Sequence, residues 1–89
     1  MGWKNPALSR YAVELVRPAH GWEDIERTAA FAREAAVALS NQGVPVRLLR
    51  TVFVPEDDAC FFLYEGPSAE SVRAAVAAAA LAGSPVESL

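Results

Sequence analysis

Histidine and cysteine, the side chains that bind most transition metals in proteins, occur once each in this sequence, as His20 and Cys60. A single cysteine excludes an intrachain disulfide and suits a reducing compartment, where we expect Cys60 to pack as a small hydrophobic residue. A transition-metal site needs three or four nitrogen or sulfur ligands, so the sequence predicts no metal. Glycine-rich phosphate loops and nucleophile motifs are also absent, and we expect no cofactor.

Basic residues are few, with eight Lys and Arg against eleven Asp and Glu. Because nucleic-acid binding depends on clustered basic side chains, we expect no nucleic-acid partner. The longest apolar run, residues 74–82, is far shorter than the roughly 20 residues that cross a bilayer. The N-terminus shows no apolar signal stretch. The sequence therefore predicts a cytoplasmic protein without membrane binding, in which residues 1–8 form a flexible arm.

Hydrophobic residues, in contrast, are abundant at 53%, against 21% charged residues. This composition excludes disorder, and the length fits one domain over residues 1–89. The hydrophobic core of a chain this short provides only marginal stability, and small proteins often gain further stability by oligomerisation.

The first half of the chain predicts a strand followed by a helix. Apolar and polar residues alternate over residues 9–17, and Pro18 ends this strand. Residues 22–41 follow a helical period, with Gly43 as the expected left-handed C-terminal cap. The apolar stripe of this helix consists of Ile25, Ala29, Ala32, Ala36 and Leu39.

The second half predicts a hairpin. Residues 44–54 and 59–65 are rich in β-branched and aromatic side chains and flank the turn Pro55-Glu56-Asp57-Asp58, which we expect to be solvated. In the first of these strands the apolar residues occupy both alternating sets, Val46/Leu48/Val52/Val54 and Leu49/Phe53. Such strands are typical of a sheet that is buried on both faces.

A second helix and a short strand complete the pattern. Ser68 is the expected N-cap of a helix over residues 69–82. A last strand is expected within residues 84–89. The side chains expected to face the core from this helix are Val72, Ala75, Val76 and Ala79.

The resulting β-α-β-β-α-β order predicts a ferredoxin-like α+β fold. We expect a four-stranded antiparallel sheet in the order 4-1-3-2 with both helices on one face. The other face would expose five or six apolar side chains, whose burial is worth roughly 10 kcal/mol. The sequence therefore predicts a two-fold homodimer, a dimeric αβ-barrel in which sheet packs on sheet. Phe31 and the apolar outer side of the second helix are candidates for contacts in a higher oligomer.

The stretch VRLLRTVFVPEDDACFFLYEGPSAESVRAAV, followed by AGSPVESL, resembles a bacterial family of small proteins described as a domain of unknown function or as nickel-binding ferredoxin-like proteins. The matching motifs are Leu49-Arg50-Thr51, the turn at 55–58 and residues 62–68, so about half the chain is covered. The resemblance implies the same dimeric αβ-barrel. It also implies metal ligands: a His in place of Arg50, a Cys in place of Phe62 and a second His in the second helix. This chain has none of them.

Two charges inside strands are the best candidates for a site. Glu14 and Arg50 have apolar neighbours, and if both lie on the open sheet face they would line a small polar pocket together with Tyr64. Such a pocket would suit an anionic or carbonyl-bearing ligand; the alternative is an ordinary ion pair or a charge at the sheet edge. His20 lies in a loop, either as a general base near neutral pH or as a solvated loop residue.

These residues favour a homodimeric module that binds a small molecule or a partner, without evident catalytic chemistry. The first alternative is a cofactor-free αβ-barrel enzyme of the oxygenase, isomerase or cyclase type, using Arg50, Tyr64, Glu14 or His20. The second, from the family resemblance, is a protein that binds nickel or another divalent metal.

Overall fold

The computed structural model describes residues 8–15, 21–81 and 83–89. Its four strands form one antiparallel sheet in the order β2-β3-β1-β4, which confirms the α+β ferredoxin-like fold. A 3-10 turn joins β2 to β3. Most of the predicted N-terminal arm and the end of the predicted first strand lie outside the described residues. The elements are β1 (Ser9–Glu14), α1 (Ile25–Asn41), β2 (Arg47–Val54), η1 (Pro55–Asp57), β3 (Ala59–Gly66), α2 (Ala69–Ala78) and β4 (Val86–Ser88).

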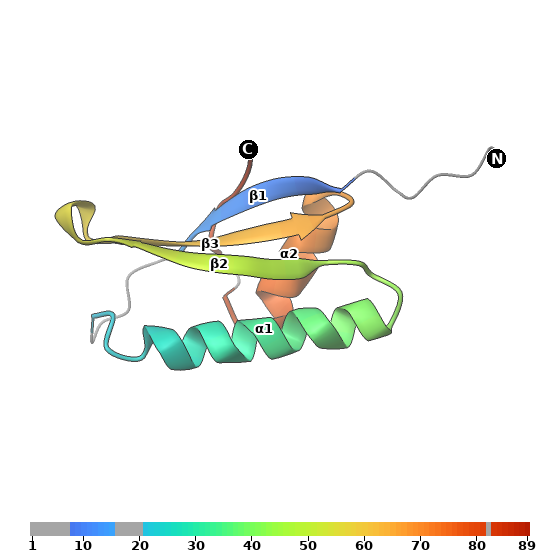
Figure 1. Ribbon diagram of the computed structural model, residues 1–89, viewed down its shortest axis with the longest axis horizontal. Coiled ribbons are helices and arrows are strands. Elements are labelled where there is room, and N and C mark those ends of the chain that lie inside the picture. The colour runs from blue at the N-terminus through green and yellow to red at the C-terminus, as the bar shows by residue number, and fades with distance from the viewer. Residues whose placement is uncertain (1–7, 16–20, 82) are drawn as a thin grey trace.

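Both helices lie on the same side of the sheet (Figure 1). α1 runs below β2, and α2 packs against α1, β3 and β4. Neither described helix is long and apolar enough to cross a membrane. One hydrophobic core fills the space between the sheet and the helices. The residues that the sheet contributes to this core are Tyr11, Val13, Leu48, Cys60, Phe62 and Tyr64, and Leu15 directly after β1 adds to them.

The predicted apolar stripes of both helices are confirmed. Ala29, Ala32 and Ala36 of α1 are buried, and Ile25 and Leu39 pack at the margin of the core. Alanine leaves little side chain between the helix and the sheet, so the α1 backbone can approach the strands closely. On α2 the four predicted residues are all buried: Val72, Ala75, Val76 and Ala79.

The helix ends follow local backbone chemistry. Ser68 caps α2 as predicted, because its Oγ accepts a hydrogen bond from the Ser71 backbone N–H at 3.2 Å. Gly43 follows α1 in the left-handed region, at φ 98°. α2 is shorter than the predicted 69–82, because Ala80 already takes φ 60° and the Leu81 N–H donates back to the Val76 carbonyl at 2.9 Å. This left-handed residue ends the helix before Gly83.

A β-bulge in β2 changes which of its side chains face the helices. Leu48 lies opposite Tyr64 and Arg50 lies opposite Leu63, so Leu49 is an extra residue with no partner in the ladder. The expectation that Val46, Leu48, Val52 and Val54 share one face is therefore wrong. The first two are buried on the helix side, whereas Val52, opposite Phe61, points to the open side.

Candidate functional site

The sheet face opposite the helices, called the open face below, is the largest candidate for a binding surface. In β3 the buried Cys60, Phe62 and Tyr64 alternate with Phe61 and Leu63, which point away from the helices and are only half-buried. Neither described helix lies over this face (Figure 1). The strand register places the following residues on it: Arg10, Ala12, Glu14, Arg47, Arg50, Val52, Val54, Ala59, Phe61, Leu63, Glu65 and Glu87.

An apolar band occupies the centre of the open face. Val52 and Phe61 lie opposite each other on β2 and β3, and Leu63 lies opposite Ala12 of β1. Each of these side chains is half-buried. The band is thus continuous across three strands, unlike the singly scattered hydrophobic residues that are normal on a protein surface.

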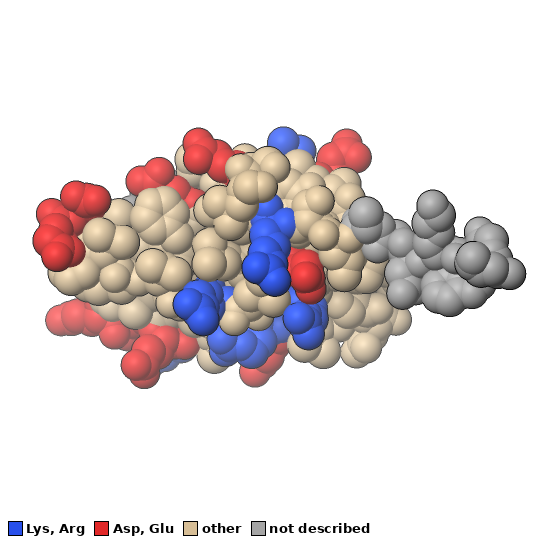
Figure 2. All heavy atoms as spheres, turned by 45° about the horizontal axis from the view of Figure 1, so that its top comes forward, with Lys and Arg blue, Asp and Glu red and all other residues tan. Residues whose placement is uncertain are grey.

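The balance of charge on the open face differs between the two ends of the strands. At one end Glu65 lies opposite both Arg10 and Arg47, and Arg47 Nη2 is 3.4 Å from Glu65 Oε1. At the other end the exposed hairpin turn carries Glu56 and Asp57. Viewed obliquely from the open side, basic side chains gather over the middle of the molecule with an acidic side chain beside them (Figure 2). Other acidic side chains lie at the hairpin tip and along the upper and lower edges of the molecule in Figure 2.

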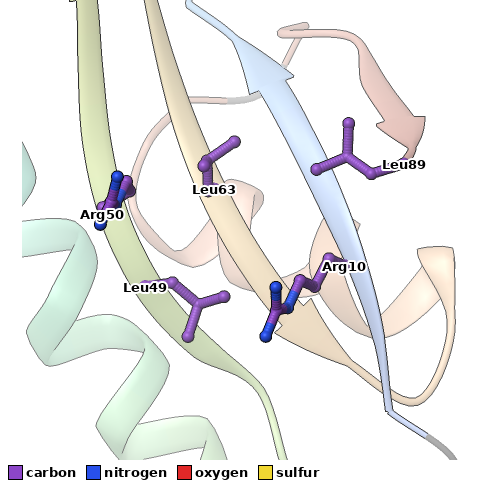
Figure 3. A pocket seen from close by; sticks show the side chains of 5 residues that line it. All are labelled: Arg10, Leu49, Arg50, Leu63 and Leu89. Carbon is purple, nitrogen blue, oxygen red and sulfur yellow. The ribbon is translucent and has the colours of Figure 1, made fainter.

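A hollow of about 440 Å³ lies beside the apolar band at the basic end. It is lined by Arg10, Leu49, Arg50, Leu63 and Leu89 (Figure 3). Arg10 stands on β1 and Arg50 on β2, on either side of Leu63 of β3. The Leu89 N–H donates to the Arg10 carbonyl at 3.0 Å, which holds Leu89 next to β1. We call this feature the arginine–leucine hollow.

Of the predicted site residues, the structure places Arg50 in the hollow and Glu14 on the same face, opposite Phe61. The expectation that Tyr64 shares this face is wrong, because Tyr64 is fully buried against the helices. Burial there raises the pKa of Tyr64 to about 12, so its phenol stays neutral. His20 lies outside the described residues.

Sequence reasoning missed Arg10, Leu49, Leu63 and Leu89 as parts of one site. Leu63 follows the alternation of β3, which is visible in the sequence. Arg10 and Leu89 reach the hollow only through the pairing of β1 with its neighbours, and the bulge turns Arg50 to the same face as its neighbour Leu49. Register and bulge position were the missing information.

The other predicted features take structural roles. Cys60 is a free, buried cysteine, and burial raises the pKa of its thiol and so lowers its nucleophilicity. The acidic turn is exposed, as expected, and Asp58 Oδ1 accepts a hydrogen bond from Trp22 Nε1 at 2.9 Å. The Trp22 ring also makes an edge contact with Phe53. Within the described part of the chain, no three His, Cys, Asp or Glu side chains gather as a metal site would require.

Comparison of the chain with family models, with curated proteins and with solved structures finds no match. The resemblance of the second half to the nickel-binding ferredoxin-like family therefore stays a prediction.

Proposed function

We propose that the protein is a homodimeric binding module, in which two open faces pack against each other and enclose a small-molecule site. The observation that supports this most directly is the apolar band of Val52, Phe61 and Leu63, which no described helix covers. Each of these half-buried side chains would gain on the order of 1 kcal/mol by complete burial. A second copy is the simplest cover, because its own band needs the same burial.

The charges of the open face favour one orientation of the two copies. If a two-fold axis crosses the strands, the basic end of each sheet lies over the hairpin end of the other. If the axis runs along the strands, Arg10 and Arg47 of one copy face the same arginines of the other, and like charges repel. The first orientation also places the apolar band of one copy on the apolar band of the other. We therefore propose that the two sheets pack with their strands antiparallel across the interface.

The lining of the arginine–leucine hollow favours binding over catalysis. Its volume of about 440 Å³ falls in the roughly 300–1,000 Å³ range of small-molecule pockets. Its polar groups are the guanidinium groups of Arg10 and Arg50, which do not exchange protons near neutral pH. Its other side chains are leucines. Such a site is suited to recognise and hold a ligand, and its described lining offers no general acid or base.

Sedimentation velocity over a range of protein concentrations tests the homodimer. We expect the wild-type protein to be a dimer and Phe61→Glu to be a folded monomer, because a carboxylate in the middle of the band would be buried without a partner. Phe31→Glu is the matched control, since Phe31 is 52% exposed on α1 and lies outside the open face. We expect it to stay dimeric. A monomeric wild-type protein at high concentration would refute the proposal.

A further inference from the structure

The two guanidinium groups of the arginine–leucine hollow have no acidic side chain as a counter-ion within the described residues. Arg47 is paired with Glu65, the acid that the register also places opposite Arg10. Among the residues that the structure describes, neither Arg10 nor Arg50 makes an ion pair, and no acidic side chain lines the hollow. Two cations therefore line the hollow.

Closure of the open face makes this arrangement costly unless an anion pairs with the two arginines, either an acidic side chain of the second copy or a ligand. A second sheet would remove water from Arg10 and Arg50, and a desolvated charge without a partner is strongly unfavourable. The planar guanidinium group pairs best with a carboxylate or a phosphate, which it binds through two parallel hydrogen bonds. An anion in the hollow would restore the hydrogen bonds that water supplies in the open state.

The walls of the hollow indicate what the anion is attached to. Leu63 lies between the two cations, and Leu49 and Leu89 line the hollow with them (Figure 3). The apolar band continues from Leu63 to Phe61. Inorganic phosphate would leave these apolar surfaces against water or void. An apolar body attached to the anionic group would bury them, at about 25 cal/mol per Å².

We infer that the ligand of this protein is an organic monocarboxylate with an apolar body, whose carboxylate is bound by Arg10 and Arg50 and whose body lies on Leu49, Leu63 and Leu89. This inference rests on the proposed function, because the second sheet is what closes the hollow. A carboxylate in the hollow lies at the interface between the two copies of the proposed dimer. Ligand binding and dimer formation therefore stabilise each other.

Calorimetric titration of the wild-type protein with acetate, hexanoate, octanoate and octanamide tests the ligand class. We expect affinity to rise from acetate to octanoate, because each added methylene buries more apolar surface. Octanamide has the same body without the charge, so it should bind at least roughly tenfold more weakly. Sodium phosphate should not compete with octanoate. Equal binding of octanoate and octanamide, or tighter binding of phosphate, would overturn the inference.

Three variants locate the site. Arg10→Gln and Arg50→Gln should each weaken octanoate binding by roughly tenfold or more, because each loses charge-assisted hydrogen bonds. Arg73→Gln, at an exposed position on α2, is the matched control and should bind like wild type. If the glutamine variants fail to fold, the comparison of octanoate with octanamide on the wild-type protein still decides.

The oligomeric state separates this inference from the proposed function. A stable wild-type dimer that binds no carboxylate would refute the ligand class and leave the homodimer standing. A dimer that dissociates in Arg10→Gln and Arg50→Gln without any ligand present would show that acidic side chains of the second copy neutralise the arginines instead. A monomer would refute the proposed function itself, whatever it binds.

Discussion

Tyr64 carries a buried hydroxyl group whose removal should stabilise the protein. The side chain is fully buried on the helix side of β3, with its ring 6.4 Å from that of Phe62. Its hydroxyl has no hydrogen-bond partner within residues 8–15, 21–81 and 83–89. Burial of an unpaired hydroxyl costs about 1–3 kcal/mol in mutational data. Phenylalanine keeps the ring, so Tyr64→Phe should raise the free energy of unfolding by about 1 kcal/mol.

Thermal unfolding followed by circular dichroism measures this effect. For a domain of this size 1 kcal/mol corresponds to a Tm shift of about 4–8 °C. Variants must be compared at one protein concentration, because self-association raises Tm by mass action. Tyr11→Phe is the control on the same face, since Tyr11 is 8% exposed and not completely desolvated. If Tyr64→Phe lowers stability by 1 kcal/mol or more, the hydroxyl has a partner and the reasoning is wrong.

The same hydroxyl predicts a pH dependence at alkaline pH. Burial raises the pKa of Tyr64 from 10.0 to about 12. Between these values the unfolded state binds fewer protons than the folded state, so stability falls as pH rises, by at most about 1.4 kcal/mol per pH unit. This contribution is complete below pH 10 and is lost toward pH 12. Between pH 10 and pH 12 the free energy of unfolding, measured in urea, should fall less steeply with pH for Tyr64→Phe than for the wild-type protein. An equal pH dependence of the two proteins would mean that burial does not raise the pKa of Tyr64.

Two further predictions concern single side chains. Ser68→Ala should lower the free energy of unfolding, measured in urea, by about 1 kcal/mol, because the Ser71 N–H loses its hydrogen-bond acceptor. Ser68→Asp should change it little, because aspartate also caps helices. Equal losses in both variants would contradict a capping role. Cys60 should react slowly with a thiol reagent in the folded protein and rapidly in denaturant, because burial raises the pKa of the thiol and blocks access of the reagent. Rapid labelling of the native protein would show that the core opens at Cys60.

Much of the fold could be predicted from local pattern. The stripe of Ala29, Ala32 and Ala36 predicted α1 because a helix brings every third or fourth residue to one side. Ser68 and Gly43 act within a few residues of their own position, so their roles were visible without any tertiary information. The hairpin followed from two apolar runs around a polar turn. The β-α-β-β-α-β order then left very few sheet topologies.

The candidate site could be predicted only in part. Arg50 was visible as a charge among apolar neighbours, and the structure places it in the hollow. Tyr64 was assigned to the wrong face, because its strand is apolar on both sides and the alternation alone does not say which set faces the helices. Arg10 gave no signal in the sequence, where it lies near the start of a strand of ordinary composition.

The sequence by itself determined the elements, their order and the excess of apolar residues, because these depend on contacts along the chain and on composition. Only the tertiary structure decided which residues share a face. The bulge at Leu49 reverses the alternation of β2, and the pairing of β1 with β3 and β4 brings Arg10, Leu63 and Leu89 together. Strand register is a relation between segments distant in sequence, and a shift of one residue turns every side chain to the other face.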